Sequence, residues 1–139
     1  MSVEENKAFV QRYVEEPWNK GNVDALDELC DPNFSLEGQG VEPFKAVIRA
    51  FRTSFPDLHF TVEEMIAEGD KVAYRWTARG THQGEYEGIA PTGKTITETG
   101  ITIIRIVDGK VVEDRFESSV PSIKEQILGG ETRPPNASE

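Results

Sequence analysis

The sequence of residues 95–118, TITETGITIIRIVDGKVVEDRFES, has the pattern of two antiparallel β-strands joined by a tight turn. Apolar and polar side chains alternate along both halves, as they do in strands that bury one face. Val107-Asp108-Gly109 separates the halves, and an Asp-Gly pair is typical of hairpin turns. We therefore expect strands at residues 95–106 and 111–118.

The register of this hairpin determines which side chains lie opposite one another. A three-residue turn at 107–109 pairs Thr102 with Asp114 and Ile104 with Val112. A two-residue Asp-Gly turn shifts the pairing by one residue and places Arg115 against Thr102. We favour the three-residue turn because it matches the apolar faces of both strands.

The rest of the chain predicts helices first and a long antiparallel meander afterwards. The expected helices are residues 3–19, 23–30, 42–54 and 120–128. The further expected strands are residues 34–37, 58–68 and 71–81. Ser2 and Glu5 form a capping box at the start of the first helix, and Pro17 disturbs its end. This order predicts an α+β domain at residues 1–128, with three N-terminal helices on one face of a curved sheet, followed by a disordered tail at 129–139.

The inward-facing side chains of this sheet predict a cavity between sheet and helices. Val112, Asp114 and Phe116 alternate with charged neighbours and should face the core. Such a cavity, mostly apolar with a few polar groups, is the usual form of a small-molecule site. The side chains expected to contact a ligand are Tyr74, Trp76, Thr102, Ile104 and Phe116.

Asp114 is the strongest candidate for acid–base chemistry, because burial on an apolar face raises the pKa of a carboxyl group. The alternative is a structural carboxylate held by a hydroxyl, an amide or Arg115. His82 is a second catalytic candidate, since an imidazole titrates near neutral pH. Its alternative role is to bond the backbone of the loop that follows it. Arg75 and Arg79 are expected on the outer face of the sheet, where they can pair with Glu98 or with acids of a second subunit.

Composition excludes several classes of protein. The 15 Lys and Arg against 25 Asp and Glu give a net charge of −10, which argues against binding nucleic acid or anionic membranes. One cysteine and two histidines exclude a thiolate metal site. The first residues have no basic, apolar pattern of a signal peptide, and no apolar run approaches membrane-spanning length. We expect a cytoplasmic protein.

Several short motifs resemble those of the SnoaL-like polyketide cyclases, a family within the nuclear-transport-factor-2-like superfamily. They are GDKV at 69–72, RW at 75–76, GTHQGE at 80–85, GIAPTGK at 88–94 and DGK at 108–110. The resemblance extends over residues 3–128. It implies an open α+β cone, association into homodimers through the sheet, and a best-known activity of intramolecular aldol closure without metal or cofactor.

The family's catalytic residues do not carry over by this resemblance. Its acid–base aspartate on the last strand corresponds to Phe116, and its supporting histidine corresponds to Thr102. Neither side chain can exchange a proton near neutral pH. The sequence therefore predicts a cofactor-free protein with a pocket for a small apolar or polycyclic molecule. It leaves open whether the protein is a cyclase, isomerase or hydratase using proton transfer, a binding protein without turnover, or a dimeric accessory module.

Overall fold

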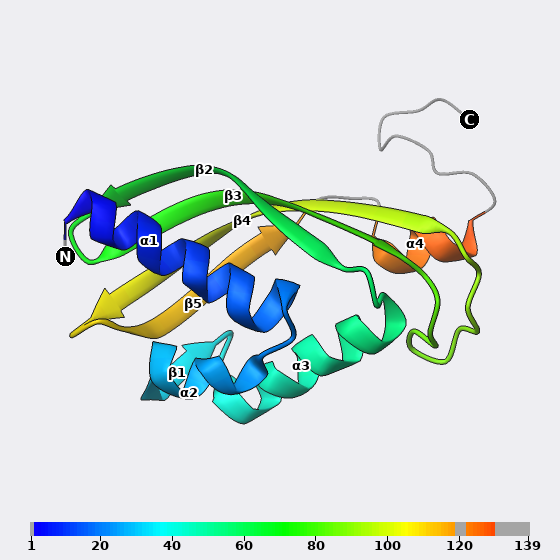
Figure 1. Cartoon of the computed structure of the whole chain (residues 1–139), viewed down its shortest axis with the longest axis horizontal. Coiled ribbons are helices and arrows are strands. Elements are labelled where there is room, and N and C mark those ends of the chain that lie inside the picture. Colours follow the sequence, from blue (N-terminus) through cyan, green and yellow to red (C-terminus); the bar gives the residue numbers. More distant parts are fainter. Residues whose placement is uncertain (1, 119–121, 130–139) are drawn as a thin grey trace.

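The described residues form a curved five-stranded sheet with helices on one side (Figure 1). The computed structural model describes residues 2–118 and 122–129. The helical segments are α1 (Val3–Val14), the π-helical turn η1 (Glu15–Asn19), the 3₁₀ turn η2 (Val23–Ala25), α2 (Leu26–Leu29), α3 (Val41–Ser54) and α4 (Ile123–Leu128). The strands are β1 (Cys30–Leu36), β2 (His59–Glu68), β3 (Lys71–Thr81), β4 (Thr95–Val107) and β5 (Lys110–Ser118). The predicted tail, apart from Gly129, lies outside the described residues.

The sheet has the strand order β1-β5-β4-β3-β2. β1 runs parallel to β5, and the other neighbouring strands are antiparallel. The sheet arches over α1, α2 and α3 without closing into a barrel, while α4 lies beside the start of β4 (Figure 1). This arrangement confirms the predicted α+β class with the N-terminal helices on one face of the sheet.

The first helix begins and ends as its sequence predicts. The Ser2 hydroxyl accepts the Glu5 N–H at 3.1 Å, and the Glu5 carboxylate accepts the Ser2 N–H at 2.9 Å. Regular α-helix stops at Val14, and the turn that contains Pro17 is π-helical. Proline has no N–H to donate to the preceding turn, so the regular ladder of hydrogen bonds cannot pass through residue 17.

The second helix is shorter than predicted. The expected helix at 23–30 is a 3₁₀ turn followed by a single α-helical turn, and Cys30 already belongs to β1. Pro32 explains the early end, because a residue that precedes proline is disfavoured in the helical conformation and Asp31 must be extended. Cys30 is buried. None of the described helices is both long and apolar enough to cross a membrane.

The register of the final hairpin differs from both predicted alternatives. The turn has two residues, Asp108 and Gly109, and the strands begin pairing at Val107 and Lys110. A bulge then follows, because Ile106 pairs with Val111 whereas Arg105 pairs with Glu113. The extra residue on β5 is therefore Val112.

The bulge changes the predicted partners but restores the predicted faces beyond it. Thr102 lies opposite Phe116, and Ile104 lies opposite Asp114. The expectation that Val112 faces the core is wrong, because the bulge leaves Val111 fully buried in its place. Asp114 is 5% exposed, so its predicted inward orientation is correct.

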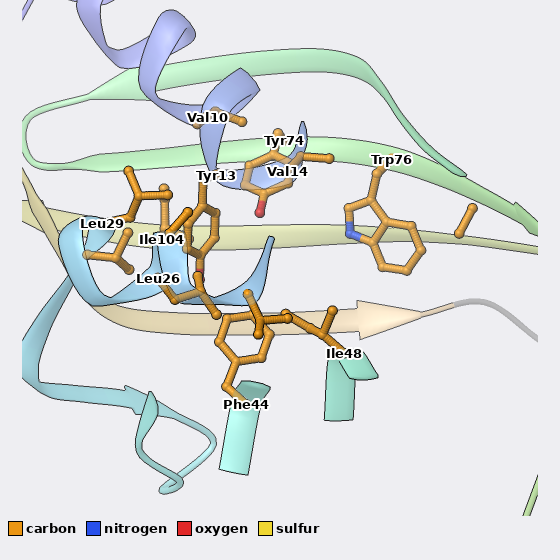
Figure 2. Close-up of a cluster of buried hydrophobic side chains, with 14 of the residues drawn as sticks. Val10, Tyr13, Val14, Leu26, Leu29, Phe44, Ile48, Tyr74, Trp76 and Ile104 are labelled. Carbon is orange, nitrogen blue, oxygen red and sulfur yellow. The ribbon is translucent and has the colours of Figure 1, made fainter. Parts of the chain in front are cut away.

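The core lies between the inner face of the sheet and the helices. Figure 2 shows side chains of α1, α2 and α3 converging on side chains of β3 and β4. Those labelled are Val10, Tyr13, Val14, Leu26, Leu29, Phe44, Ile48, Tyr74, Trp76 and Ile104. These contacts hold the helices on the sheet and leave a hollow beside them.

Candidate functional site

A cavity of about 390 Å³ lies between the inner face of the sheet and the helices. Its size lies within the range of roughly 300–1,000 Å³ typical of small-molecule sites. Apolar and aromatic side chains dominate the wall, and its charged members are the acids Glu37, Glu98 and Asp114. The full lining is Val14, Trp18, Leu36, Glu37, Gln39, Phe44, Val47, Phe51, Leu58, Phe60, Tyr74, Trp76, Ala78, Ile96, Glu98, Thr102, Asp114, Phe116 and Ile123.

Asp114 is a buried carboxyl group in this wall. The Tyr13 hydroxyl donates a hydrogen bond of 2.6 Å to its Oδ2. Burial raises the pKa of Asp114 from its usual 3.8 to about 6, and the hydrogen bond from Tyr13 moderates the rise. Burial and the charge of Asp114 also raise the pKa of Tyr13, so the phenol keeps its proton and remains a donor. A carboxyl group with this pKa can both accept and return a proton near neutral pH.

Tyr74, Trp76 and Thr102 form a connected group on the neighbouring strands. Tyr74 and Trp76 project from β3 toward the helices (Figure 2), and the Trp76 indole N–H donates to the Thr102 hydroxyl at 2.9 Å. Burial, followed by the charge of Asp114, raises the pKa of Tyr74, while its hydrogen bond with Thr102 lowers it. The Tyr74 phenol therefore keeps its proton and is neutral, as is the Thr102 hydroxyl.

The remaining predicted contacts divide between the cavity and the core. Phe116 lines the cavity and is also 43% exposed, which places it at the open side. Ile104 is fully buried and is not among the residues that line the cavity. The two positions that correspond to the family's acid–base pair, Thr102 and Phe116, are direct neighbours across β4 and β5.

His82 lies behind the loop of residues 82–94, outside the cavity wall. Its ring is fully buried, and Nδ1 accepts the Thr92 N–H at 3.1 Å, with the Thr92 hydroxyl at 3.0 Å. Its backbone N–H donates to the Lys94 carbonyl, and its own carbonyl accepts the Gly93 N–H. Among the described residues, Nε2 has no hydrogen-bond partner. These contacts fit the alternative role of His82, which is to bond the backbone of the loop that follows it.

The same loop is fixed against α3 by its small and aromatic residues. A side chain at Gly84 would bring a Cβ within 2.2 Å of the Thr53 carbonyl oxygen, so the backbone approaches α3 as only glycine allows. The half-buried Tyr86 packs on Phe51 and Phe55. Loop and helix together close one end of the sheet.

The arginines on β3 face away from the cavity, as predicted. Arg75 and Arg79 are exposed, and Arg75 Nε lies 3.5 Å from Glu64 Oε1. The predicted pairing of an arginine with Glu98 is wrong, because Glu98 faces inward on β4 while both arginines face outward.

Glu98 is one of the cavity residues that the sequence interpretation missed. It lies on β4 at the same parity as the inward-facing Ile96, Gly100 and Thr102. Burial raises its pKa, and a hydrogen bond with Ser118 lowers it. The alternation itself was the signal, because position 98 falls on the inner face of the predicted strand.

Across residues 2–118 and 122–129, no three His, Cys, Asp or Glu side chains converge so that they could hold a metal ion. The buried Cys30 thiol has a pKa raised to about 12, mainly by burial, and so lacks the character of a metal-binding thiolate. The polar side chains in the described cavity wall are Glu37, Gln39, Tyr74, Trp76, Glu98, Thr102 and Asp114.

Comparisons with known proteins show that most of the chain is similar to one family. A family model described as SnoaL-like polyketide cyclase matches residues 8–127. An aklanonic acid methyl ester cyclase of Streptomyces galilaeus is 30% identical over 119 residues, 80% of this chain and 82% of that protein. The aklanonic acid methyl ester cyclase of Streptomyces peucetius is 28% identical over 116 residues, 77% of this chain and 79% of that protein.

Solved structures show the same fold. AclR of Streptomyces galilaeus, a candidate hydroxylase, has a TM-score of 0.82 and 29% identity, covering 96% of this chain and 91% of its own. TsrD of Streptomyces laurentii has a TM-score of 0.82 at 24% identity, covering 91% of this chain and 97% of its own. At that identity the likeness to TsrD bears on the fold alone.

Proposed function

We propose that this chain, which belongs to the SnoaL-like polyketide cyclase family, is a cofactor-independent enzyme. It cyclises or isomerises a small polycyclic molecule by proton transfer. Asp114 acts as its general acid and base. The observation that supports this assignment is a carboxyl group with a pKa of about 6 in the wall of a largely apolar cavity of about 390 Å³.

The proposed reaction needs only one proton carrier. The Asp114 carboxylate removes a proton from a carbon beside a carbonyl group, which leaves an enolate. The enolate carbon attacks a second carbonyl carbon of the same molecule, forming a carbon–carbon bond and an alkoxide. Protonated Asp114 returns its proton to that alkoxide. Substrate and product are isomers, so the step requires no oxidant, reductant or second substrate.

The surrounding residues support this chemistry in two ways. The aromatic side chains of Trp18, Phe60 and Trp76 give a wall suited to flat ring systems and exclude water from them. The Tyr13 hydroxyl fixes one oxygen of Asp114, which leaves the other oxygen to exchange a proton. Aklanonic acid methyl ester, which gives the two cyclase relatives their name, is the first substrate to test.

The alternative function is binding without turnover. It is favoured by one specific observation: the family's acid–base pair is replaced by Thr102 and Phe116, which face each other across the two strands. In that case Asp114 is a structural partner of Tyr13, and the cavity carries or senses a ligand.

An Asp114→Asn variant distinguishes the two functions. The variant keeps an acceptor for the Tyr13 hydroxyl but cannot carry a proton. Conversion of aklanonic acid methyl ester at pH 8, followed by chromatography, should fall at least about 100-fold, as removal of a general base usually causes. Glu117→Gln, on the exposed face of the same strand, is the matched control and should keep full activity.

Two results would contradict the enzymatic proposal. One is full activity of Asp114→Asn, which removes Asp114 from the chemistry. The other is wild-type protein that binds a ligand, detected by native mass spectrometry, yet converts no substrate. The second result supports the binding function.

A further inference from the structure

Glu98 occupies a position on the inner sheet face that favours an apolar side chain. Its neighbours on the same face of β4 are Ile96 and Gly100. Its pairing partner on the neighbouring strand β3 is the buried Ala78. Among the described residues no Lys, Arg or His side chain forms an ion pair with it, and its polar partner is the Ser118 hydroxyl. A carboxylate in such surroundings retains the capacity to accept hydrogen bonds from a guest molecule.

Glu98 and Asp114 line the cavity at different positions along the length of β4. Asp114 pairs with Ile104, six residues further along β4 than Glu98. At the rise of a strand, Glu98 and Ile104 are at most about 20 Å apart along β4. The side chains of Glu98 and Asp114 line the same cavity, which therefore extends along the inner face of the sheet between them.

The negative charge of the cavity wall determines which class of ligand the cavity can bind. Glu37, Glu98 and Asp114 line the cavity, and no Lys, Arg or His belongs to the described lining. A carboxylate group on the ligand would meet only repulsion there, whereas a hydroxyl group can donate to an acid.

We infer that Glu98 anchors the ligand by accepting a hydrogen bond from a ligand hydroxyl group, at the end of the cavity opposite Asp114. The substrate class is then an elongated, uncharged polycyclic molecule with a hydroxyl group remote from the reacting carbon. This inference rests on the proposed function, because it assumes that the cavity receives a small polycyclic molecule.

The test compares probes that differ in one hydrogen-bond donor. The probes are 2-(hydroxymethyl)anthraquinone, its methyl ether 2-(methoxymethyl)anthraquinone, and anthraquinone-2-carboxylate. Binding at pH 8 is followed by quenching of tryptophan fluorescence, since both tryptophans of the chain, Trp18 and Trp76, line the cavity. The wild-type protein should bind the alcohol about tenfold or more tightly than the ether, as expected for a hydrogen bond to a charged acceptor. It should bind the carboxylate most weakly.

The variant Glu98→Gln should reduce the preference for the alcohol to less than about threefold and tighten binding of the carboxylate. Glu117→Gln, which removes one charge from the exposed outer face of β5, should leave both ratios unchanged. Thermal unfolding of each variant verifies that the fold is intact.

Each contrary result has a distinct meaning. If wild-type protein binds alcohol and ether equally, or Glu98→Gln keeps the tenfold preference, the role of Glu98 is overturned while the proposed function stands. If wild-type protein binds none of the three probes, both the proposed polycyclic ligand and the anchoring role of Glu98 are overturned.

Discussion

At the scale of single residues, Asp114 is held in a setting that favours its protonated form. Burial accounts for the rise of its pKa, and the Tyr13 hydroxyl offsets only part of it. The charged carboxylate of Asp114 therefore destabilises the fold, whereas a carboxylate that stabilised the fold would have a lowered pKa.

This setting predicts how stability changes with pH. The folded-state pKa of about 6 lies above the usual 3.8, so between about pH 4 and pH 6 the folded protein holds a proton that the unfolded chain has released. The contribution of Asp114 to the free energy of unfolding thus falls as pH rises through this window. The total fall is about 3 kcal/mol.

The variant Asp114→Asn should accordingly be more stable than wild type at pH 8, by up to about 3 kcal/mol, with the difference vanishing near pH 4. Urea denaturation at pH 4, 6 and 8 measures this, with Glu117→Gln as a control that should show no such trend. A variant less stable than wild type at pH 8 would assign Asp114 a structural role.

Gly100 has an equally local effect on the cavity. A Cβ at this position would lie 2.3 Å from Trp76 Cζ2 and 2.7 Å from the Glu117 carbonyl oxygen. Gly100→Ala should therefore displace the Trp76 ring and lower the free energy of unfolding by about 1–3 kcal/mol, the usual cost of overpacking. Denaturation followed by tryptophan fluorescence tests this.

Gly40→Ala is the control, because the Cβ position at residue 40 is open. It should lower the free energy of unfolding by less than about 1 kcal/mol, the usual scale of an unfavourable N-cap. Equal effects would contradict the prediction.

At the scale of secondary-structure elements, the β4–β5 hairpin sets the position of Asp114. Its turn residues Asp108 and Gly109 both have positive φ, at 51° and 76°. Such a two-residue turn matches the twist of the strands, and the bulge at Val112 then returns Asp114 to the inner face.

The turn makes this element sensitive to one substitution. Gly109→Ala should lower the free energy of unfolding by about 1–2 kcal/mol, because a Cβ is unfavourable at positive φ. Asp108→Asn should change it by less than about 0.5 kcal/mol, since Asn tolerates that conformation. Chemical denaturation measures both, and a Gly109→Ala variant as stable as wild type would argue against this turn.

The sequence predicts strands with a long alternating pattern better than it predicts which residues of neighbouring strands pair. The strands β3 and β4 were located within one residue, because alternation over ten or more residues marks one buried face. The bulge was invisible, since Val111 and Val112 are both valine and alternation cannot tell which is the extra residue. Glu98 was missed because its charge suggested an ion pair with arginine, although its parity indicated the inner face.

At the scale of the whole molecule, the outer face of the sheet carries exposed apolar side chains. Ile66, Ile101 and Ile103 are 66%, 50% and 46% exposed. Ile66 and Ile103 both pair with Ala73, so they form one row across three strands. We propose that this row is the centre of the homodimer interface expected from the family resemblance.

Disruption of this row should separate the subunits. Ile103→Lys should be a monomer in sedimentation velocity at concentrations where wild type is a dimer, because an unpaired charge is costly at the centre of an apolar interface. Leu128→Lys, exposed on α4 and away from the row, should remain dimeric. A wild-type protein that sediments as a monomer would contradict the proposed interface.

The cavity is a whole-molecule feature that the sequence predicts only in part. Its sheet wall follows from the alternation of Tyr74, Trp76 and Thr102, which the sequence displays. Its opposite wall depends on how α3 and the π-helical turn pack, which brings Trp18 and Phe44 to the cavity from distant segments. Local pattern carries no information about that packing.

The pH dependence of kcat/KM for aklanonic acid methyl ester tests the role of Asp114 most directly. The wild-type value should rise about tenfold per pH unit below pH 6 and level off above it, because only the carboxylate can remove the proton. Asp114→Asn should show a low rate without that inflection. A wild-type profile with no inflection near pH 6, or one that Asp114→Asn reproduces, would contradict the account.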